Sequence, residues 1–155
     1  MPETPEPFSY SALKHDFVSS ITKIDCEDWN RLAGKENPFT RYEFFEALEV
    51  SKCTSKESGW QPHHLVIRIE EETVGILPLF LKTNSYGEYV FDWSWARAYE
   101  QAGLNYYPKL ISAIPFTPSA GERVFLSKNV ARASLLKSIV AILNDEAREN
   151  KFSSW

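Results

Sequence analysis

The sequence contains few of the residues that build disulfides, metal centres and phosphate-binding loops. Its two cysteines, Cys26 and Cys53, lack a CxxC spacing, so neither a disulfide framework nor a zinc knuckle is indicated. No two of the six glycines lie closer than 12 positions apart, which excludes GxGxxG and GxxxxGK[ST] loops. The adjacent His63 and His64 would point to opposite faces of a strand and could not share one ion. We expect no resident metal, and no cofactor-binding residue can be named.

Long hydrophobic runs and an excess of positive charge are also missing. The longest apolar stretch, 74–81, is far shorter than the roughly 20 residues of a membrane helix. The amino terminus lacks the basic and apolar regions of a secretory signal. Seventeen Lys and Arg against 21 Asp and Glu give a net charge of -4, which argues against general affinity for nucleic acid or anionic lipid. We expect a cytoplasmic protein with no membrane insertion and no nucleic-acid partner.

The composition is that of one folded domain. With 155 residues, 43% apolar and 14% aromatic, the chain is long enough for a single core without staples. Residues 1–12 hold three of the nine prolines and are expected to form a flexible leader, with the domain spanning 13–155. Residues 152–155 resemble the opening of a further strand, so we expect the domain to be incomplete at its C-terminus.

Hydrophobic periodicity predicts an α/β fold. Residues 63–71 alternate with period two, as in a half-exposed strand, and 74–81 are apolar on both faces, as in a central strand. A polar turn between them predicts a hairpin. The other expected elements are a strand at 17–21, a helix capped by Asp25 that carries Trp29 and Leu32, a helix at 40–52 with Thr40 and Glu43 forming a capping box, strands at 88–92, 109–114 and 123–126, a helix at 94–101 stopped by Gly103, and a last helix capped by Ser127 or Asn129 that buries Leu136, Ile139, Val140, Leu143 and Ala147.

Aromatic residues are concentrated in one segment. Eight of the 22 residues from 86 to 107 are Tyr, Trp or Phe, and Glu88, Asp92, Arg97 and Glu100 lie among them. Amphipathic rings beside a few charges are typical of a concave site for a polar ligand. An aromatic core whose tyrosine hydroxyls reach water is the alternative.

Asp92 is the sharpest candidate in this segment, since Phe91 and Trp93 flank it. Burial would raise the pKa of Asp92 and make it a base, unless Lys109 or Arg97 pairs with it. It could equally cap the helix that follows.

Tyr106 and Tyr107 are adjacent on a segment that reads as extended. Side chains of neighbouring residues on a strand point to opposite faces. At most one of the two is therefore expected to line a given site.

Several blocks together carry a family resemblance. The stretch KTNSYGEYVFDWSWARAYEQAGLNYYPKLISAIPFTPSAGERVF follows NPFTRYEFFEALEVSKC, GWQPHHL and GILPLFLK. Read whole, residues 37–126 resemble predicted bacterial N-acyltransferases of the GNAT superfamily, of the FemAB-like type labelled peptidoglycan-biosynthesis proteins. One departure is Asn84, where that pattern has histidine before the serine.

The resemblance implies the first of two GNAT-like halves, each a mixed, mostly antiparallel sheet with helices on both faces. Such enzymes move an acyl group from acyl-CoA or another activated donor to an amine acceptor, and the donor-phosphate loop belongs to the C-terminal half, so this half alone would be inactive. A non-catalytic module that binds a sugar or peptide in an aromatic groove, and a purely structural half, remain alternatives.

The family blocks and the chemistry of their side chains together give a candidate site. Asp92 and Tyr107 are the catalytic candidates, as possible proton acceptors. Lys109 and Arg123 are available for an anionic group. The substrate-binding candidates are Tyr86, Glu88, Trp93, Tyr106, Lys109, Thr117 and Arg123.

Overall fold

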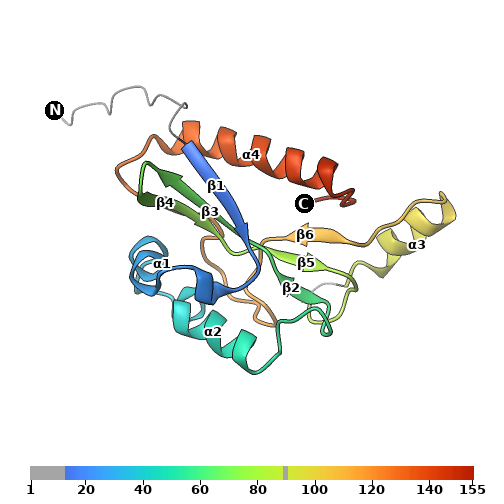
Figure 1. Ribbon diagram of the computed structural model, residues 1–155. Coiled ribbons are helices and arrows are strands. Elements are labelled where there is room, and N and C mark those ends of the chain that lie inside the picture. The colour runs from blue at the N-terminus through green and yellow to red at the C-terminus, as the bar shows by residue number, and fades with distance from the viewer. Residues whose placement is uncertain (1–12, 89–90) are drawn as a thin grey trace.

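The computed structural model describes residues 13–88 and 91–155, which contain four α-helices and two β-sheets (Figure 1). The expected leader, 1–12, lies outside the described residues, as do two residues of the strand expected at 88–92; Glu88, Phe91 and Asp92 are not in strands. The elements are β1 (Leu13–Val18), α1 (Cys26–Ala33), α2 (Tyr42–Val50), β2 (Trp60–Pro62), β3 (His64–Ile69), β4 (Glu72–Leu77), β5 (Phe80–Lys82), α3 (Trp93–Gln101), β6 (Lys109–Ile111), β7 (Phe125–Leu126) and α4 (Arg132–Glu149), with 3-10 turns at Ile21–Lys23 and Pro38–Thr40.

One hairpin contributes to both sheets. The sheet orders are β1-β3-β4-β7 and β2-β5-β6, and all five pairings among the described strands are antiparallel. The predicted hairpin is confirmed, but the strand expected at 74–81 is broken at Pro78, and Pro62 interrupts the partner strand. Proline has no N–H to donate to a ladder, so the β3–β4 ladder stops there and the two strands continue in the second sheet as β2 and β5. The His63 amide bridges the break by donating to the Leu79 carbonyl (2.9 Å).

Helices cover both faces of the four-stranded sheet, as expected (Figure 1). Leu65 and Ile67 of β3 pack in one cluster with residues of α4. Val66, which points the other way, packs in a second cluster with Trp29 of α1 and Phe45 of α2. The expectation of a half-exposed strand at 63–71 is therefore wrong over residues 64–67, which are buried on both sides because each face of the sheet has its own helices.

The two N-terminal helices begin differently. Asp25 caps α1 as predicted, accepting from the Asp28 amide (2.9 Å). The capping box at Thr40 is wrong: Thr40 ends a 3-10 turn and its hydroxyl donates to the Asn37 carbonyl (2.9 Å). Helix α2 begins two residues later, because Pro38 starts a tight turn of its own that is capped by the Asn37 side chain.

The C-terminal helix also departs from its expected start and buried face. Its N-cap is Ala131; Ser127 instead accepts from the Asn129 amide (3.3 Å) in the preceding turn. Val140, expected on the buried side, is 43% exposed. The buried positions follow a single narrow stripe that faces β3 and β4, formed by Leu135, Ile139 and Leu143.

Several boundaries also move. Strand β1 begins four residues before the predicted start, while β6 and β7 are shorter than expected. Residues 153–154 lie along β6: the Ser153 amide donates to the Pro108 carbonyl and the Leu110 amide to the Ser154 carbonyl, both at 3.0 Å. This pairing agrees with the strand-like pattern of 152–155.

Candidate functional site

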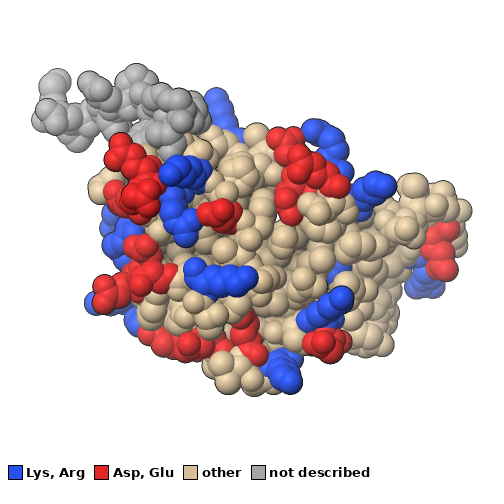
Figure 2. Space-filling model, in the orientation of Figure 1, with Lys and Arg blue, Asp and Glu red and all other residues tan. Residues whose placement is uncertain are grey.

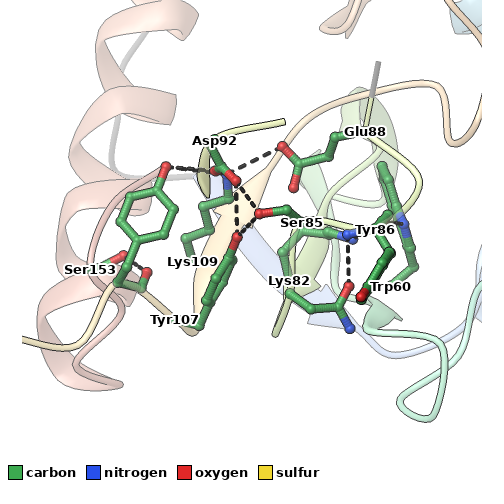
Figure 3. Close-up of polar contacts among 11 residues, drawn as sticks. Trp60, Lys82, Ser85, Tyr86, Glu88, Asp92, Tyr107, Lys109 and Ser153 are labelled. Atoms are coloured by element: carbon green, nitrogen blue, oxygen red, sulfur yellow. Dashed lines mark hydrogen bonds and ion pairs between the residues drawn. The ribbon is translucent and has the colours of Figure 1, made fainter. Parts of the chain in front are cut away.

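A buried cation, Lys82, stabilises the turn after β5. Lys82, the last residue of β5, is fully buried, and its ammonium lies 4.0 Å from the centroid of the Trp60 ring. Both the Lys82 ammonium and the Trp60 indole N–H donate to the Tyr86 carbonyl, each at 2.8 Å (Figure 3). Gly87 follows with φ +78°, where a Cβ would lie 2.3 Å from the Phe116 ring. This packing fixes the position of the next residue, Glu88.

Asp92 is the hub of a polar cluster at the start of α3. Its carboxylate accepts hydrogen bonds from Tyr106 (2.7 Å) and Tyr107 (2.9 Å), and also from Ser85 and Lys109 (Figure 3). Within the described residues Asp92 stands at the N-cap of α3 without capping it through its side chain. Asp92 is therefore one member of a largely buried ion pair, and its side chain does not cap the helix.

The pairing with Lys109 sets the charge of Asp92. Burial alone would raise the pKa of Asp92, but hydrogen bonds from Lys109, Ser85 and both tyrosines hold it well below its usual range. Burial, together with the hydrogen bond to Asp92, raises the pKa of Tyr107 to about 12. Near neutral pH, Asp92 is thus ionised and Tyr107 is a proton donor.

The pKa values of two groups near this cluster, Lys82 and Glu88, are shifted toward neutral pH. Burial lowers the pKa of Lys82 to about 8, and the nearby charge of Lys109 adds to this shift. Burial raises the pKa of Glu88, with help from the charge of Asp92 and against that of Lys109. Ionisable groups with pKa values displaced in opposite directions are a common feature of proton-transfer sites.

Glu88 also forms part of the wall of a cavity of about 270 Å³. Its side chain is 9% exposed, and one carboxylate oxygen, Oε2, accepts from Lys109 at 3.3 Å. The other oxygen, Oε1, is buried and has no hydrogen-bond partner among the described residues. The remaining wall includes Trp60, Ile111, Ile114, Phe116, Thr117 and Arg123.

Arg123 lines this cavity but is already used by its own loop. Its guanidinium donates to the carbonyls of Ser119 (2.6 Å) and Gly121 (3.0 Å). Lys109 is likewise engaged, with two carboxylates. Of the two residues considered available for an anionic group, only Arg123 lines the cavity.

The structure brings together most of the predicted site residues. Glu88, Asp92, Tyr106, Tyr107 and Lys109 form one cluster, and Thr117 and Arg123 share the cavity wall with Glu88. The prediction that the two tyrosines face opposite ways is wrong, because strand β6 begins only at Lys109 and the preceding segment does not alternate.

Two of the predicted site residues lie apart from the cluster. Three residues that build or support the site were not predicted from the sequence. The side chains of Tyr86 and Trp93 are exposed, at 70% and 53%. Ser85, Lys82 and Trp60 were missing from the candidates. A lysine directly after a strand that is apolar on both faces was the available signal for Lys82; Trp60 precedes the aromatic segment and gave none.

The aromatic segment is neither a core nor a closed groove in its described part. Phe91 and Trp93 stack with ring centroids 4.8 Å apart, and Trp95 is 64% exposed. None of the described residues of α3 is buried, and the helix projects from the body (Figure 1). Figure 2 shows charged side chains over β1, α1, α2 and the later part of α4, while the surface between these elements and the outer end of α3 is mostly uncharged.

Histidines and carboxylates elsewhere form pairs. His63 and His64 point to opposite faces as predicted, and contact Glu146 (2.7 Å) and Glu49 (3.2 Å) respectively. Across residues 13–88 and 91–155, no three potential His, Cys, Asp or Glu ligands gather at one point. In the same ranges, no helix has the length and apolar character needed to cross a membrane.

These features define an α/β protein with a charged, largely buried site next to a cavity. The chain belongs to the FemAB-like family, described as peptidoglycan biosynthesis/recognition, whose profile matches residues 20–155. Members of this family are transferases of peptidoglycan synthesis, and membership implies a peptidoglycan-related transferase role. Neither a curated protein nor a solved structure matches the chain.

Proposed function

We propose that this chain is the acceptor-side, N-terminal half of a GNAT-like N-acyltransferase acting in the cytoplasm. It would help to move an acyl group from acyl-CoA, or a similar activated donor, to an amine acceptor. The observation that supports this proposal is the group of four buried charges, Lys82, Glu88, Asp92 and Lys109, placed beside a cavity. A structural half would have no need to bury this array.

Acyl transfer to an amine requires a proton acceptor, because an ammonium ion has no lone pair for attack. The Asp92–Lys109 ion pair and the hydroxyl of Tyr107 keep the cluster in one arrangement, and Lys109 in turn holds Glu88 at the cavity. The roles proposed for Asp92 and Tyr107 are therefore to position the groups that face the substrate. Thr117 and Arg123, which line the same cavity, would also contact the acceptor.

The donor is assigned to a second GNAT-like half that completes the enzyme. Such a half would carry the phosphate-binding loop and the backbone donors that stabilise the oxyanion. This division of labour agrees with the spacing of the glycines in the present sequence.

The test compares Asp92→Asn and Tyr107→Phe in a protein extended to include the second half. Thiol release from acetyl-CoA and a longer acyl-CoA is followed with an amino-acid amide as acceptor, and circular dichroism monitors the fold. We expect both variants to lose turnover, by roughly 10- to 100-fold, at temperatures where circular dichroism shows that they are folded. The conservative surface variant Glu149→Gln serves as control. Full turnover in both site variants would contradict the proposal.

A second candidate function rests on the exposed Phe91–Trp93 stack. Exposed aromatic rings on a mostly uncharged surface are suited to contact the apolar faces of sugars. As a non-catalytic binding module, the chain would lose affinity for a peptidoglycan disaccharide on Trp93→Ala and would show no transferase activity in the extended form. Calorimetry with that disaccharide distinguishes the two functions.

A further inference from the structure

Glu88 is the carboxylate of the cavity wall with an uncommitted hydrogen-bond acceptor. Its side chain is more than nine-tenths buried, Lys109 occupies Oε2 at 3.3 Å, and within 13–88 and 91–155 nothing donates to Oε1. A buried oxygen of this kind is costly unless a ligand or a water molecule supplies the missing donor. The turn that carries Glu88 is fixed by Lys82 and Trp60, and Glu88 belongs to the wall of the cavity.

We propose that Glu88 binds the ammonium group of the acceptor in this cavity and accepts its proton. The inference rests on the proposed function, and it assigns the proton acceptor to a residue other than Asp92 or Tyr107.

Burial of Glu88 and the occupied state of Asp92 favour this assignment, against the positive charges of Lys109 and Lys82. Glu88 faces Lys109 from β6, Lys82 from β5 and Asp92 from the start of α3. Asp92 already accepts from four donors, which leaves it little capacity for a ligand. Burial raises the pKa of Glu88 above its ordinary value, so Glu88 takes up a proton more readily than an exposed glutamate would.

The composition of the wall indicates an amine with an apolar stem. Glu88 and Arg123 are the charged residues of the described wall, and a permanently charged arginine repels an ammonium toward the carboxylate. Ile111, Ile114 and Phe116 supply apolar surface for methylene groups. A buried carboxylate gains more from a cationic donor than from a neutral hydroxyl, which favours an amine over a sugar alcohol.

The proton transfer fits the overall reaction. The ammonium gives one proton to the Glu88 carboxylate and becomes a neutral amine, whose lone pair attacks the thioester carbonyl carbon of acyl-CoA. The C–N bond forms and the C–S bond breaks. The second proton lost from nitrogen goes to the leaving thiolate, and Glu88 later releases its own proton to water. The products are an amide, free CoA and one proton.

Binding can be tested on the 155-residue chain with a charged probe and its neutral counterpart. Butylammonium and 1-butanol, which have the same chain length, are titrated at pH 7 and followed by NMR. We expect butylammonium to bind the wild type at least tenfold more tightly than 1-butanol and to lose at least tenfold in Glu88→Gln. Glu149→Gln makes the same change on an exposed part of α4 and should bind as the wild type does. Equal butylammonium affinity in Glu88→Gln and wild type would overturn the proposal.

A measurement on the wild type covers the case in which Glu88→Gln does not fold. The Glu88 carboxyl carbon is titrated by carbon-13 NMR with and without saturating butylammonium. A cation bound at Oε1 stabilises the ionised carboxylate, so the pKa of Glu88 should fall when the probe is present. An unchanged pKa would overturn the assignment.

The extended, two-half protein separates this inference from the proposed function. We expect Glu88→Gln to lower kcat about 100-fold and to remove the acid limb of the pH profile. If the extended protein transfers acyl groups and Glu88→Gln does so at the wild-type rate, the assignment of Glu88 is wrong while the proposed function stands. If the wild-type extended protein transfers no acyl group to any amine, the proposed function fails and the proton-transfer step fails with it.

Discussion

The ammonium of Lys82 lies over the ring of Trp60, 4.0 Å from its centroid, and is completely buried there. Both side chains donate to the same carbonyl, that of Tyr86, so a cation and an indole together fix the turn that leads to Glu88. A cation over an aromatic face is stabilised by the ring quadrupole, which offsets part of the cost of removing the charge from water. The cost that remains appears in the pKa of Lys82, which burial lowers to about 8.

Lys82→Met is expected to change how stability depends on pH. The unfolded chain holds a lysine proton up to pH roughly 10.4, whereas the folded chain releases it near pH 8. Between these values the unfolded state binds more protons, so raising the pH favours folding. We expect the wild type to gain about 1–2 kcal/mol relative to Lys82→Met between pH 8 and pH 10. Urea unfolding at intervals across this range measures the difference.

Lys128→Met is the matched control, since Lys128 is exposed. Its stability should run parallel to that of the wild type at every pH. If the stability of Lys82→Met also runs parallel to that of the wild type, Lys82 keeps an ordinary pKa in the folded state and its burial does not favour the neutral amine.

His64 should make stability sensitive to weakly acidic pH. Its Nδ1 accepts from the Leu79 amide (3.2 Å), which places the proton on Nε2, beside Glu49. Burial lowers the pKa of His64, so below about pH 6.5 the unfolded chain takes up a proton that the folded chain resists, and stability falls. His64→Leu leaves the buried Leu79 amide without a partner and removes one donor from Glu49, which keeps those of Ser20 and Ile21, so we expect a loss of about 1–3 kcal/mol at pH 7.5.

The pH dependence provides the sharper comparison. Between pH 5.5 and 7.5, thermal unfolding should shift less in His64→Leu than in the wild type, because the variant lacks the titrating imidazole. His15→Leu, at an exposed position of β1, should retain the wild-type slope. An equal slope in His64→Leu would assign the pH dependence to other groups.

Local signals predicted the parts of the fold that local chemistry determines. The hairpin follows from alternation around a polar turn, the start of α1 from Asp25, and the end of α3 near Gly103, whose φ is +71°. The errors arise where tertiary contacts decide. Thr40 and Glu43 have the spacing of a capping box, but Asn37 and Pro38 form a competing turn, and Glu43 pairs with Arg41 (3.1 Å) instead.

The site was predictable in composition but not in arrangement. The sequence offered Lys109 as a partner for Asp92, and the ion pair forms. Whether Asp92 is a base with a raised pKa or one member of an ion pair depends on its distance from Lys109, which sequence spacing does not provide. Tyr106 and Tyr107 converge on one carboxylate because their segment is irregular, a property that alternation cannot anticipate. Lys82 of β5 packs against Trp60 of the neighbouring strand β2, and no local sequence pattern predicts this contact.

Asp92→Asn is expected to destabilise the fold much more than the loss of a surface ion pair. Lys109 would keep only Glu88 as an anionic partner, and removing one member of a buried pair costs about 3–5 kcal/mol. Since the pKa of Asp92 is lowered in the folded state, its contribution is present at neutral pH and is lost as the pH falls below roughly 4. The difference from wild type, measured by urea unfolding, should therefore shrink on acidification.

Asp145→Asn is the control, because Asp145 pairs with Arg148 on the exposed side of α4 at 2.9 Å. A surface pair of this kind contributes about 0–1 kcal/mol. Equal losses in the two variants would mean that the Asp92 cluster is solvated to the same degree as the surface pair.

Gly87→Ala and Gly103→Ala separate backbone strain from steric overlap at the cavity. Both glycines have a positive φ, +78° and +71°, so alanine is strained by roughly 1–2 kcal/mol at either position. At Gly103 a Cβ meets nothing within 4 Å, whereas at Gly87 it would lie 2.3 Å from the Phe116 ring and 2.6 Å from the Trp60 indole nitrogen. We expect Gly87→Ala to cost about 1–3 kcal/mol more than Gly103→Ala in urea unfolding. The added methyl group should also displace Phe116 and disturb the wall beside Glu88, so that butylammonium binding weakens in Gly87→Ala alone. Equal stability of the two variants would show that the turn at Gly87 can relax, and that the cavity wall is not fixed by the contact of Gly87 with Phe116 and Trp60.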